Sequence, residues 1–427
     1  MNNNIRNKNI WMFHHYATPP TMSGLSRPYN FGVNLRNFGY NVKVFAASYL
    51  HYSDKNLINN NDLYIINNDV NIPFLFIRTS SYSRNGIGRV FNMIDYYKNL
   101  FKVTKEVVKN GEKPNLIIAS SPHPLTMIAG IKISNKLGVP CICEVRDFWP
   151  EVFFMGGRLK ERSLLGKVLV RLEHWIYKKA DAIVFLKEGD YTYITDKRWD
   201  LQQGGRIDLG KCYYINNGVN VEAFSNKIEK EKFDDVDLFN GKFNVVYVGA
   251  IRPVNNVGNI LDAAKLLKDE KDIQFLIYGD GNQIGELKRR IIDEDLFNVK
   301  IKGYIDKKYI PYVLSKSSLN ILNYAQNQYN WTRGNSSNKL FEYMASGKPI
   351  ISTVKMGYSI IDKYKCGFEL ENASGGDLAN AILKIKYMPN EKYHDLCINA
   401  KNGAKEFDYK VLTKKLIEVI NSARKGK

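Results

Sequence analysis

The sequence has no apolar run that approaches the roughly 20 residues of a membrane-spanning helix. It opens on a polar, Asn-rich stretch without the apolar segment of a secretion signal. Its five cysteines are odd in number and scattered, so neither a disulfide framework nor the spacing of a zinc site is present. We therefore expect a cytoplasmic protein without a metal centre.

Two nucleotide-binding fingerprints are also missing. The chain contains neither the GxGxxG pattern of dinucleotide-binding folds nor a Walker phosphate loop. Acidic residues are scarce relative to basic ones, 43 against 62, which gives a formal net charge of +19. This excess favours nucleic acid, an acidic membrane face or phosphorylated substrates as partners, although a genome biased towards Lys and Asn would give the same composition.

At 427 residues the chain is long enough for two domains, each with its own core. Short apolar strands alternate with amphipathic helices in both halves, which predicts an α/β fold with parallel sheets. The charged stretch 226–237 indicates a solvated connector between the halves. The expected strands are 10–13, 41–46, 114–121, 139–145 and 182–186, then 243–248, 273–278, 299–302, 319–322 and 349–353.

The most informative stretch runs from Gly334 to Pro349 and reads GNSSNKLFEYMASGKP. Apolar residues recur at helical spacing after a polar start, and Gly347 ends the pattern. We therefore expect a loop that turns into a helix and is followed by a buried strand. The polar start offers three good helix N-cap residues: Ser336, Ser337 and Asn338.

Lys339 falls in the first turn of this helix, where the helix dipole disfavours a cation unless an anion is also present. A phosphate or diphosphate would satisfy both Lys339 and the free N–H groups of the helix N-terminus. Glu342 lies three residues on and on nearly the same face, where it could accept hydrogen bonds from ribose hydroxyls. The alternative is an ordinary capped helix with a surface ion pair between these two residues.

The segment NKLFEYMASGKPII resembles the donor-binding segment of glycosyltransferase family 4, in the branch that builds bacterial surface polysaccharides. The resemblance implies that Glu342 binds the ribose of a nucleotide. Many members carry a second Glu eight residues earlier, facing the donor sugar, where this chain has Gly334. The family also uses an Arg on the donor phosphates, at the position of Arg252. Its usual Lys partner is absent here, so we expect Lys339 to supply that charge.

The resemblance implies the GT-B fold, in which two Rossmann-like domains face each other across a cleft and the last helix crosses back to the first domain. We expect residues 1–218, with the helix 410–427, to bind the acceptor and residues 219–409 to bind the donor. Glycines at strand ends let a ligand approach the backbone closely. The expected donor site comprises Arg252, Lys339, Glu342, Ser336, Ser337, Asn338, Gly249, Gly303 and Tyr304.

Two histidine positions stand at strand ends in the first half. His14 and His15 are adjacent on an extended chain and point to opposite faces, so we expect one to pack and the other to face the cleft, without a metal. His123 lies between two prolines after the strand 114–121, which favours a role at the cleft, with a structural role as the alternative. The resemblance places this histidine near the donor sugar, and we predict that it is catalytic.

The segment EVRDFWPE also resembles a motif of this branch. Arg146 and Asp147 could form a buried ion pair or could line the acceptor groove, and the sequence does not separate the two. Arg27, in the first loop of the family pattern, and His15 complete the residues that we expect to bind the acceptor.

The resemblance implies transfer of a hexosyl or N-acetylhexosaminyl group with retention of configuration. The expected donor is a nucleotide sugar, with UDP as the nucleotide, and the acceptor is a glycan or a polyprenyl-diphosphate-linked glycan of capsule, lipopolysaccharide or exopolysaccharide synthesis. The sequence shows no closely spaced carboxylate pair of the glycosidase kind. Stabilisation of the departing diphosphate is therefore the expected chemistry, without a metal or cofactor.

Two other classes stay open. A sugar-nucleotide epimerase would share the donor site but would need acid–base carboxylates and no acceptor groove. A basic nucleic-acid-binding protein would explain the charge but not the strand-end glycines, so we expect no nucleic-acid partner.

Two segments in the first half combine basic with aromatic or apolar residues. In Tyr82–Lys109 nucleic-acid binding, an interfacial helix and a plain core-facing helix all fit the pattern. Leu159–Ala180 predicts one long amphipathic helix whose apolar stripe packs on a sheet. We expect these segments to hold the acceptor domain peripherally on an anionic membrane surface at the inner face of the membrane.

Overall fold

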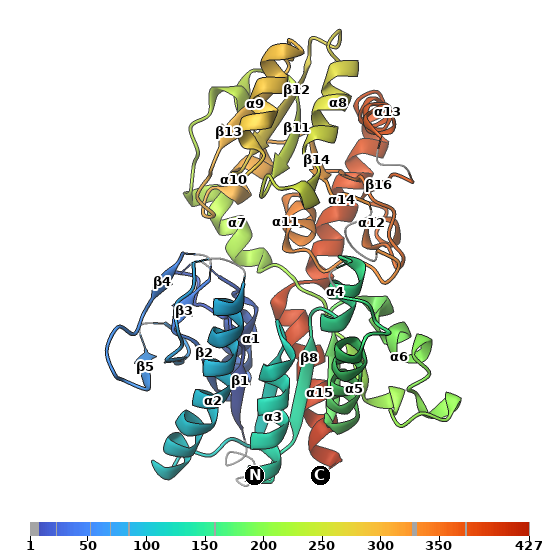
Figure 1. Cartoon of the computed structure of the whole chain (residues 1–427). Coiled ribbons are helices and arrows are strands. Elements are labelled where there is room, and N and C mark those ends of the chain that lie inside the picture. The colour runs from blue at the N-terminus through green and yellow to red at the C-terminus, as the bar shows by residue number, and fades with distance from the viewer. Residues whose placement is uncertain are drawn as a thin grey trace. The chain divides into compact units, whose positions relative to one another are not determined.

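The computed structural model describes residues 8–22, 24–51, 53–68, 70–83, 86–157, 159–326, 331–371 and 374–426 (Figure 1). The chain forms two compact units. Unit 1 consists of Met1–Leu186, Asp190–Ile215 and Leu412–Lys427, and unit 2 of Lys187–Gly189 and Asn216–Val411. No helix among the described residues is both long and apolar enough to span a membrane.

Unit 1 is built on one eight-stranded sheet. Its strands lie in the order β10 (Cys212–Tyr214), β9 (Ala182–Phe185), β8 (Cys141–Val145), β7 (Leu116–Ser120), β1 (Asn9–Phe13), β2 (Asn41–Ala47), β6 (Phe74–Ile77) and β5 (Tyr64–Asn67). All neighbours are parallel except β5 and β6. The strand order reverses between β1 and β7, and open α/β sheets bind ligands beyond the carboxyl ends of the strands at such a point.

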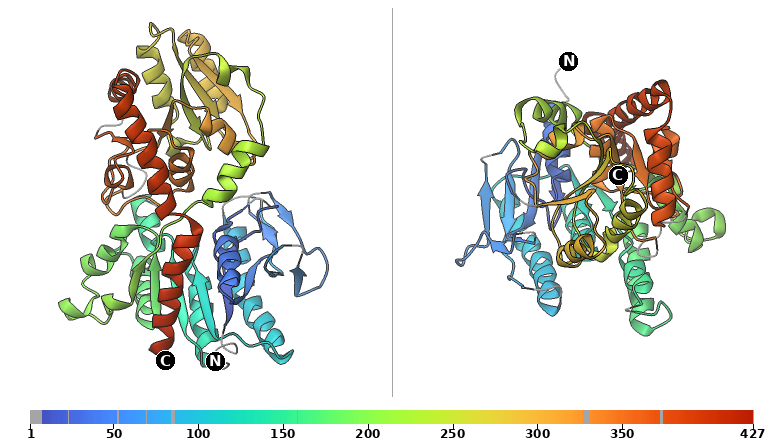
Figure 2. Two further views of the ribbon diagram at one scale, coloured as in Figure 1. Left: turned by 180° about the vertical axis from the view of Figure 1, so that it is seen from behind. Right: turned by 90° about the horizontal axis from the view of Figure 1, so that it is seen from above.

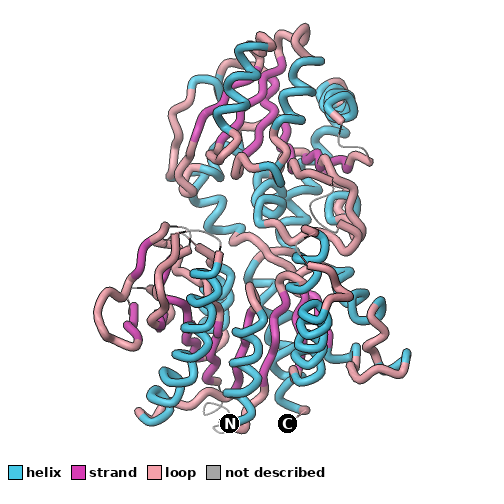
Figure 3. The backbone as a smooth tube through the Cα atoms, viewed as in Figure 1, coloured by secondary structure: helices cyan, strands magenta, loops and turns pink. Residues whose placement is uncertain are grey.

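Helices cover this sheet and close the core of unit 1 (Figure 3). They are α1 (Arg27–Asn37), α2 (Ile87–Lys109), α3 (Pro124–Leu137), α4 (Trp149–Met155), α5 (Leu164–Lys179), α6 (Thr192–Asp196) and α15 (Tyr409–Lys425). A short antiparallel pair, β3 (Tyr49–Leu50) and β4 (Lys55–Asn56), follows β2. The last helix, α15, begins in unit 2 and belongs to unit 1 from Leu412 onward, so it returns to the first unit as expected.

Unit 2 is built on a six-stranded sheet that is parallel throughout. Its strands lie in the order β13 (Val299–Gly303), β12 (Ile273–Tyr278), β11 (Phe243–Val248), β14 (Leu319–Leu322), β15 (Ile350–Ser352) and β16 (Gly367–Glu369). The order reverses between β11 and β14. The helices of this unit appear in two further orientations in Figure 2. They are α7 (Val221–Lys230), α8 (Gly258–Leu266), α9 (Ile284–Asp293), α10 (Ile310–Ser315), α11 (Asn338–Ser346), α12 (Ile360–Lys363), α13 (Gly375–Lys386) and α14 (Asn390–Glu406).

The expected α/β class and all ten expected strands are confirmed, with bounds that differ by at most two residues. The stretch 226–237 is largely exposed, as expected, but it lies inside unit 2 and does not connect the two units. Helix α7 extends to Lys230, and Asp237 is buried. Lys302 binds Asp235 at 2.7 Å and Asp237 at 2.5 Å, so these acidic residues tie the segment to β13.

The long helix expected over Leu159–Ala180 is shorter, because α5 begins at Leu164. Ser163 is its N-cap, and its hydroxyl accepts a hydrogen bond from the backbone N–H of Gly166 at 3.1 Å. Core packing of the whole apolar stripe is also wrong, since Leu164 is 82% and Leu165 57% exposed.

Arg27, at the start of α1, is buried inside unit 1. Its guanidinium donates to the Glu144 carboxylate at 2.9 Å and to the carbonyl oxygen of Ile215 at 2.8 Å. Its cation also lies 4.6 Å from the centre of the Phe31 ring. The predicted acceptor-binding role of Arg27 is therefore corrected to a structural one: it joins α1, β8 and the end of β10.

We expect Arg27→Met to destabilise the protein by about 3–5 kcal/mol, because it leaves the buried Glu144 carboxylate without its cation. Replacing both partners, in Arg27→Met with Glu144→Leu, removes the unpaired charge and should recover much of that loss. Chemical denaturation measures both, with Arg36→Met in the exposed last turn of α1 as a control. A double variant as unstable as the single one would contradict this account.

Candidate functional site

The site in unit 2 is organised around Lys339, in the first turn of α11. Its ammonium nitrogen Nζ lies 4.6 Å from the centre of the Tyr324 ring and 5.0 Å from the centre of the Tyr247 ring. The Nζ–H also donates to the Tyr247 hydroxyl oxygen at 3.5 Å. Tyr247 comes from β11 and Tyr324 follows β14, so the two strands at the order reversal supply the two rings. Ring faces attract a cation without neutralising it.

Lys339 has no carboxylate within ion-pair distance among the described residues. Burial lowers the pKa of Lys339 to about 8, and the nearby Glu342 opposes this shift. Burial raises the pKa of Glu342, while the charges of Lys307, Lys227 and Lys339 work against the rise. The alternative of a Lys339–Glu342 surface ion pair is therefore wrong. A half-buried cation and a half-buried carboxyl stand near each other, and neither forms an ion pair among the described residues.

The loop before α11 is held from the segment that opens unit 2. The side-chain amides of Asn216 and Asn217 donate to the carbonyl oxygens of Asn335 at 2.9 Å and Ser336 at 2.6 Å. Ser337 is the N-cap residue, as the sequence allowed, but its hydroxyl accepts a hydrogen bond from the Tyr324 hydroxyl at 2.7 Å. In the part of the chain that the structure describes, no side chain caps this helix, so its first N–H groups remain available to an anion. Asn338, the first helical residue, is exposed.

Three glycines stand at the ends of consecutive strands. A Cβ atom on Gly249 would lie 3.1 Å from the Nζ of Lys339, so Gly249 and Lys339 are neighbours. A Cβ atom on Gly279 would lie 1.8 Å from the carbonyl oxygen of Gly249, so Gly279 is needed for this close backbone approach. The backbone N–H of Gly279 donates to the carbonyl oxygen of Gly303 at 2.7 Å. The glycines thus bring three strand ends together beside Lys339.

Two predicted donor residues lie on the surface of unit 2. Arg252 is exposed at the start of the short helical turn after β11. Tyr304 is 79% exposed. Of the predicted donor residues, the structure brings Gly249, Lys339 and Glu342 together, and it leaves the side chains of Arg252 and Tyr304 in solvent.

In unit 1 the predicted histidines meet inside the protein. Nε2 of His123 lies 2.8 Å from Nδ1 of His15, and Nε2 of His15 lies 2.7 Å from the side-chain oxygen of Asn92. His14 and His15 are both buried, so the expectation that one of them is open is wrong. Burial lowers the pKa of His15 to about 3 and that of His123 well below its ordinary range. Both imidazoles are therefore neutral at pH 7.

Arg146 and Asp147 do not form an ion pair with each other, which was one of the two arrangements that the sequence left open. Asp147 is exposed, and Arg146 is half-buried with its Nη1 atom buried and without a hydrogen-bond partner among the described residues. The backbone N–H of Arg146 donates to the Ser121 hydroxyl at 2.9 Å. These two side chains remain candidates for contact with a ligand.

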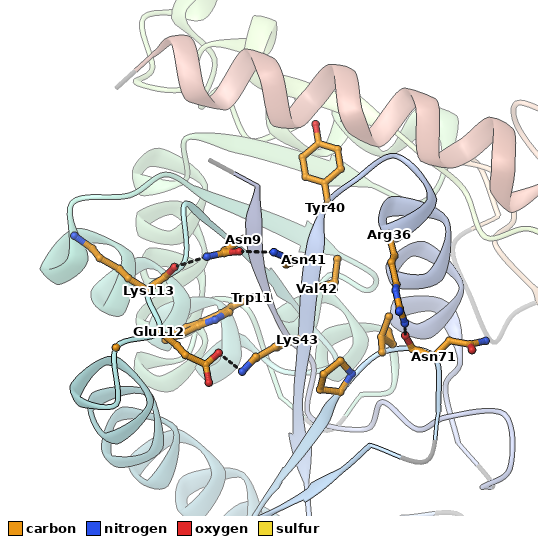
Figure 4. Close-up of a pocket in the computed structure, with 13 residues that line it drawn as sticks. Asn9, Trp11, Arg36, Tyr40, Asn41, Val42, Lys43, Asn71, Glu112 and Lys113 are labelled. Atoms are coloured by element: carbon orange, nitrogen blue, oxygen red, sulfur yellow. Dashed lines mark hydrogen bonds and ion pairs between the residues drawn. The ribbon is translucent and has the colours of Figure 1, made fainter. Parts of the chain in front are cut away.

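A cavity of about 520 Å³ lies elsewhere in unit 1, at the amino ends of β1 and β2 (Figure 4). Its polar groups pair with one another: Asn41 donates to Asn9 at 3.1 Å, Asn9 donates to the carbonyl oxygen of Lys113 at 3.2 Å, and Lys43 binds Glu112. The histidines stand at the carboxyl ends of the same sheet. The cavity is therefore not part of the site predicted in unit 1. Among the residues that the structure describes, no group of His, Cys, Asp and Glu is arranged to hold a metal ion.

Sequence reasoning missed three residues that shape these sites. Tyr247 looked like an ordinary strand residue, and Tyr324 lies beyond the expected strand 319–322. Asn92 lies in the second turn of α2, in a segment read only for its basic and aromatic residues. A polar residue on the buried side of a helix, as Asn92 is, was the one signal available. Arg84 of that segment lies outside the described residues.

Comparison with known proteins agrees with this geometry. Residues 242–386, all in unit 2, match the family described as Glycosyl transferases group 1. The chain is 23% identical over 256 residues to "Probable glycosyltransferase WbjE" of Pseudomonas aeruginosa, across 60% of this chain and 59% of that protein. It is 29% identical over 190 residues to TuaH of Bacillus subtilis, which is named as a teichuronic acid biosynthesis glycosyltransferase, across 44% of each chain.

The fold is shared over almost the whole chain with a solved structure, Anabaena HepE in complex with UDP. The TM-score is 0.66 at 15% sequence identity, across 97% of this chain and 100% of that one. The expected GT-B fold with two Rossmann-like domains is therefore confirmed. The curated relatives are matched over only about half of their length, 59% and 44%.

The buried histidines predict an acid-sensitive fold. His15 has an ordinary pKa of 6.5 and a folded pKa of about 3, so below pH 6.5 the unfolded chain takes up a proton that the folded chain refuses. In this window His15 alone should lower the unfolding free energy by about 1.4 kcal/mol per pH unit. His15→Gln removes that titration. Denaturation at pH 7, 6 and 5 should therefore give a shallower loss of stability for the variant, and parallel losses would contradict the prediction.

Proposed function

We propose that this protein is a glycosyltransferase that moves a sugar from a nucleotide sugar to a glycan or lipid-linked glycan during synthesis of a bacterial surface polysaccharide. The match of unit 2 to group 1 glycosyl transferases and the names of the two relatives support the reaction class. They favour it over a sugar-nucleotide epimerase. The UDP bound to the structural neighbour supports a UDP-sugar as donor.

The observation that carries this proposal is the environment of Lys339. Its cation is half-buried and contacts the rings of Tyr247 and Tyr324. It lies beside the N-terminus of α11, which has no side-chain cap among the described residues, and beside Gly249 at the end of β11. A diphosphate there would supply the missing negative charge and would bind the free N–H groups. Glu342, one turn further along the helix, would accept hydrogen bonds from the ribose.

The chemistry that we propose is leaving-group stabilisation. Lys339 and the helix amides bind the diphosphate more tightly as its charge develops, which lowers the barrier to departure. Arg252, on the turn that follows Gly249 and Ala250, would add a second cation from its exposed position. This scheme calls for no metal or cofactor. Transfer of a hexosyl or N-acetylhexosaminyl group with retention of configuration is the form that we propose, and His123 would lie near the reacting sugar.

Replacing Lys339 with Met tests the donor site. We expect the loss of this charge-assisted contact to cost about 2–3 kcal/mol of transition-state stabilisation, or roughly 30- to 150-fold in kcat. Glu342→Gln keeps one acceptor oxygen, so it should mainly weaken binding of UDP. The measurements are calorimetric titration with UDP and release of UDP from UDP-sugars.

Lys348→Met is the matched control, since Lys348 is a half-buried lysine just beyond the other end of α11. It should leave UDP affinity unchanged. Equal UDP binding by the wild type, Lys339→Met and Lys348→Met would reject the site. A sugar ester trapped on Glu342 would show that this residue is a nucleophile instead.

We also propose that unit 1 docks on an anionic membrane surface that carries the acceptor. Helices α2 and α5 lie on either side of α3 on one face of the sheet (Figure 1). Their first turns expose large apolar side chains, and α5 is flanked by exposed basic ones. The apolar residues are Ile87, Val90 and Phe91 on α2 and Leu164, Leu165 and Val168 on α5, and the basic residues are Lys160, Arg162, Lys167 and Arg171. This combination fits a headgroup layer over a hydrocarbon boundary.

Sedimentation with vesicles tests this contact. Each basic residue near an anionic surface contributes about 1 kcal/mol, within a screening length of about 10 Å. We expect binding to anionic vesicles that weakens as salt rises. Leu164→Ser with Leu165→Ser should reduce it by about a hundredfold or more, since burying each leucine contributes about 1.5–3 kcal/mol. Ile292→Ser, at an exposed apolar position of unit 2, should change nothing. Equal binding to neutral and anionic vesicles would refute the docking.

A further inference from the structure

Three buried side chains in unit 1 form a continuous chain of hydrogen bonds. The side-chain oxygen of Asn92 on α2 lies 2.7 Å from Nε2 of His15, which follows β1. Nδ1 of His15 lies 2.8 Å from Nε2 of His123, the N-cap residue of α3. Asn92, His15 and His123 are 0%, 1% and 0% exposed. Water cannot reorganise such a chain, so each proton has to be placed by the partners themselves.

The orientation of the Asn92 amide is fixed at its other end. Its nitrogen Nδ2 donates to the backbone carbonyl oxygen of Ser80. A flipped amide would set its oxygen against that carbonyl oxygen, and two acceptors cannot bond. The oxygen of Asn92 therefore faces His15. Since this oxygen can only accept, Nε2 of His15 carries a proton and donates it.

The remaining protons follow from neutrality. Burial keeps His15 neutral: it lowers the pKa of His15 to about 3, with the hydrogen bond to Asn92 working against this shift and the charge of nearby Arg89 adding to it. A neutral imidazole holds one proton, so Nδ1 of His15 is an acceptor and Nε2 of His123 must donate to it. The opposite arrangement would require a buried imidazolium at His15. The Thr126 hydroxyl oxygen, 3.5 Å from Nε2 of His123, can share this proton as a second, longer acceptor.

Nδ1 of His123 is then left without a proton. It is buried and has no hydrogen-bond partner among the described residues. An unmet buried acceptor is unfavourable, and a donor group on a ligand would satisfy it. This atom is the part of the ring that remains for a ligand, and a hydroxyl of a sugar is a donor of the required kind.

We propose that Asn92 is a positioning residue, which acts through His15 to fix the tautomer of His123, so that His123 meets a sugar hydroxyl as a hydrogen-bond acceptor through Nδ1. The chain of hydrogen bonds exists in the protein without a ligand. Only the identity of the ligand as a sugar rests on the proposed function. His123 is thus prepared to accept a hydrogen bond from a hydroxyl and not to donate one to a departing oxygen.

Nitrogen NMR of the whole protein labelled with ¹⁵N in its six histidines reads the tautomers directly, without substrate. The His123→Gln spectrum identifies the His123 signals. At pH 8 we expect Nε2 of His123 to be protonated and Nδ1 to be unprotonated, and likewise at His15. A proton on Nδ1 of His123 in the wild type would overturn the proposal, whether or not the protein transfers sugars.

Two variants at Asn92 test whether this residue fixes the tautomer of His123 or only stabilises the fold. Asn92→Asp keeps an acceptor oxygen for His15, whereas Asn92→Leu removes it, and both lose the amide that binds Ser80. We expect the wild-type tautomer in Asn92→Asp and a mixture of tautomers at His123 in Asn92→Leu. If Asn92 had only a structural role, the tautomer of His123 would change in the same way in both variants. A wild-type spectrum of Asn92→Leu would overturn the proposal. If Asn92→Leu does not fold, a mixture of His123 tautomers in Asn92→Asp would overturn it.

Discussion

Both units depend on one constraint of parallel sheets: the strands are buried along their length and can present polar groups only where they end. In unit 1 the order reverses between β1 and β7, and the residues that follow these strands bring His15 and His123 into hydrogen-bond contact. In unit 2 it reverses between β11 and β14, which contribute the rings around Lys339. The same topology thus creates two sites of different chemistry.

The two sites differ in how burial acts on charge. Burial removes the charge of the histidines altogether, which leaves a neutral network whose protons are ordered by Asn92. Burial lowers the pKa of Lys339 to about 8, with Glu342 opposing the shift, so Lys339 keeps its charge below pH 8, and the tyrosine rings attract this cation without neutralising it. The first arrangement suits recognition of hydroxyls, and the second suits an anion. This division is the one that the proposed acceptor-binding and donor-binding roles of the two units require.

The surface of unit 1 adds a third property. The first turns of α2 and α5 expose apolar side chains. Further along the same helices, the apolar side chains are buried in the core of unit 1. The apolar side of these helices therefore extends past the core onto the surface, and basic residues surround the exposed end of α5. A surface of this kind is poorly matched to water alone, and it lies in the unit whose predicted ligand is the acceptor.

The sequence by itself determined the α/β class, ten of the strands and the helix that begins near Ser337, because apolar periodicity and helix-capping residues act over a few neighbouring positions. It also singled out Lys339, Glu342 and His123, since glycines, prolines and charges at strand ends are local signals. Only the tertiary structure decided what surrounds them. The rings of Tyr247 and Tyr324, the pairing of Arg27 with Glu144, and the Asn92–His15–His123 chain join residues far apart in sequence. Whether a side chain is paired or exposed depends on such distant neighbours, which no local pattern encodes.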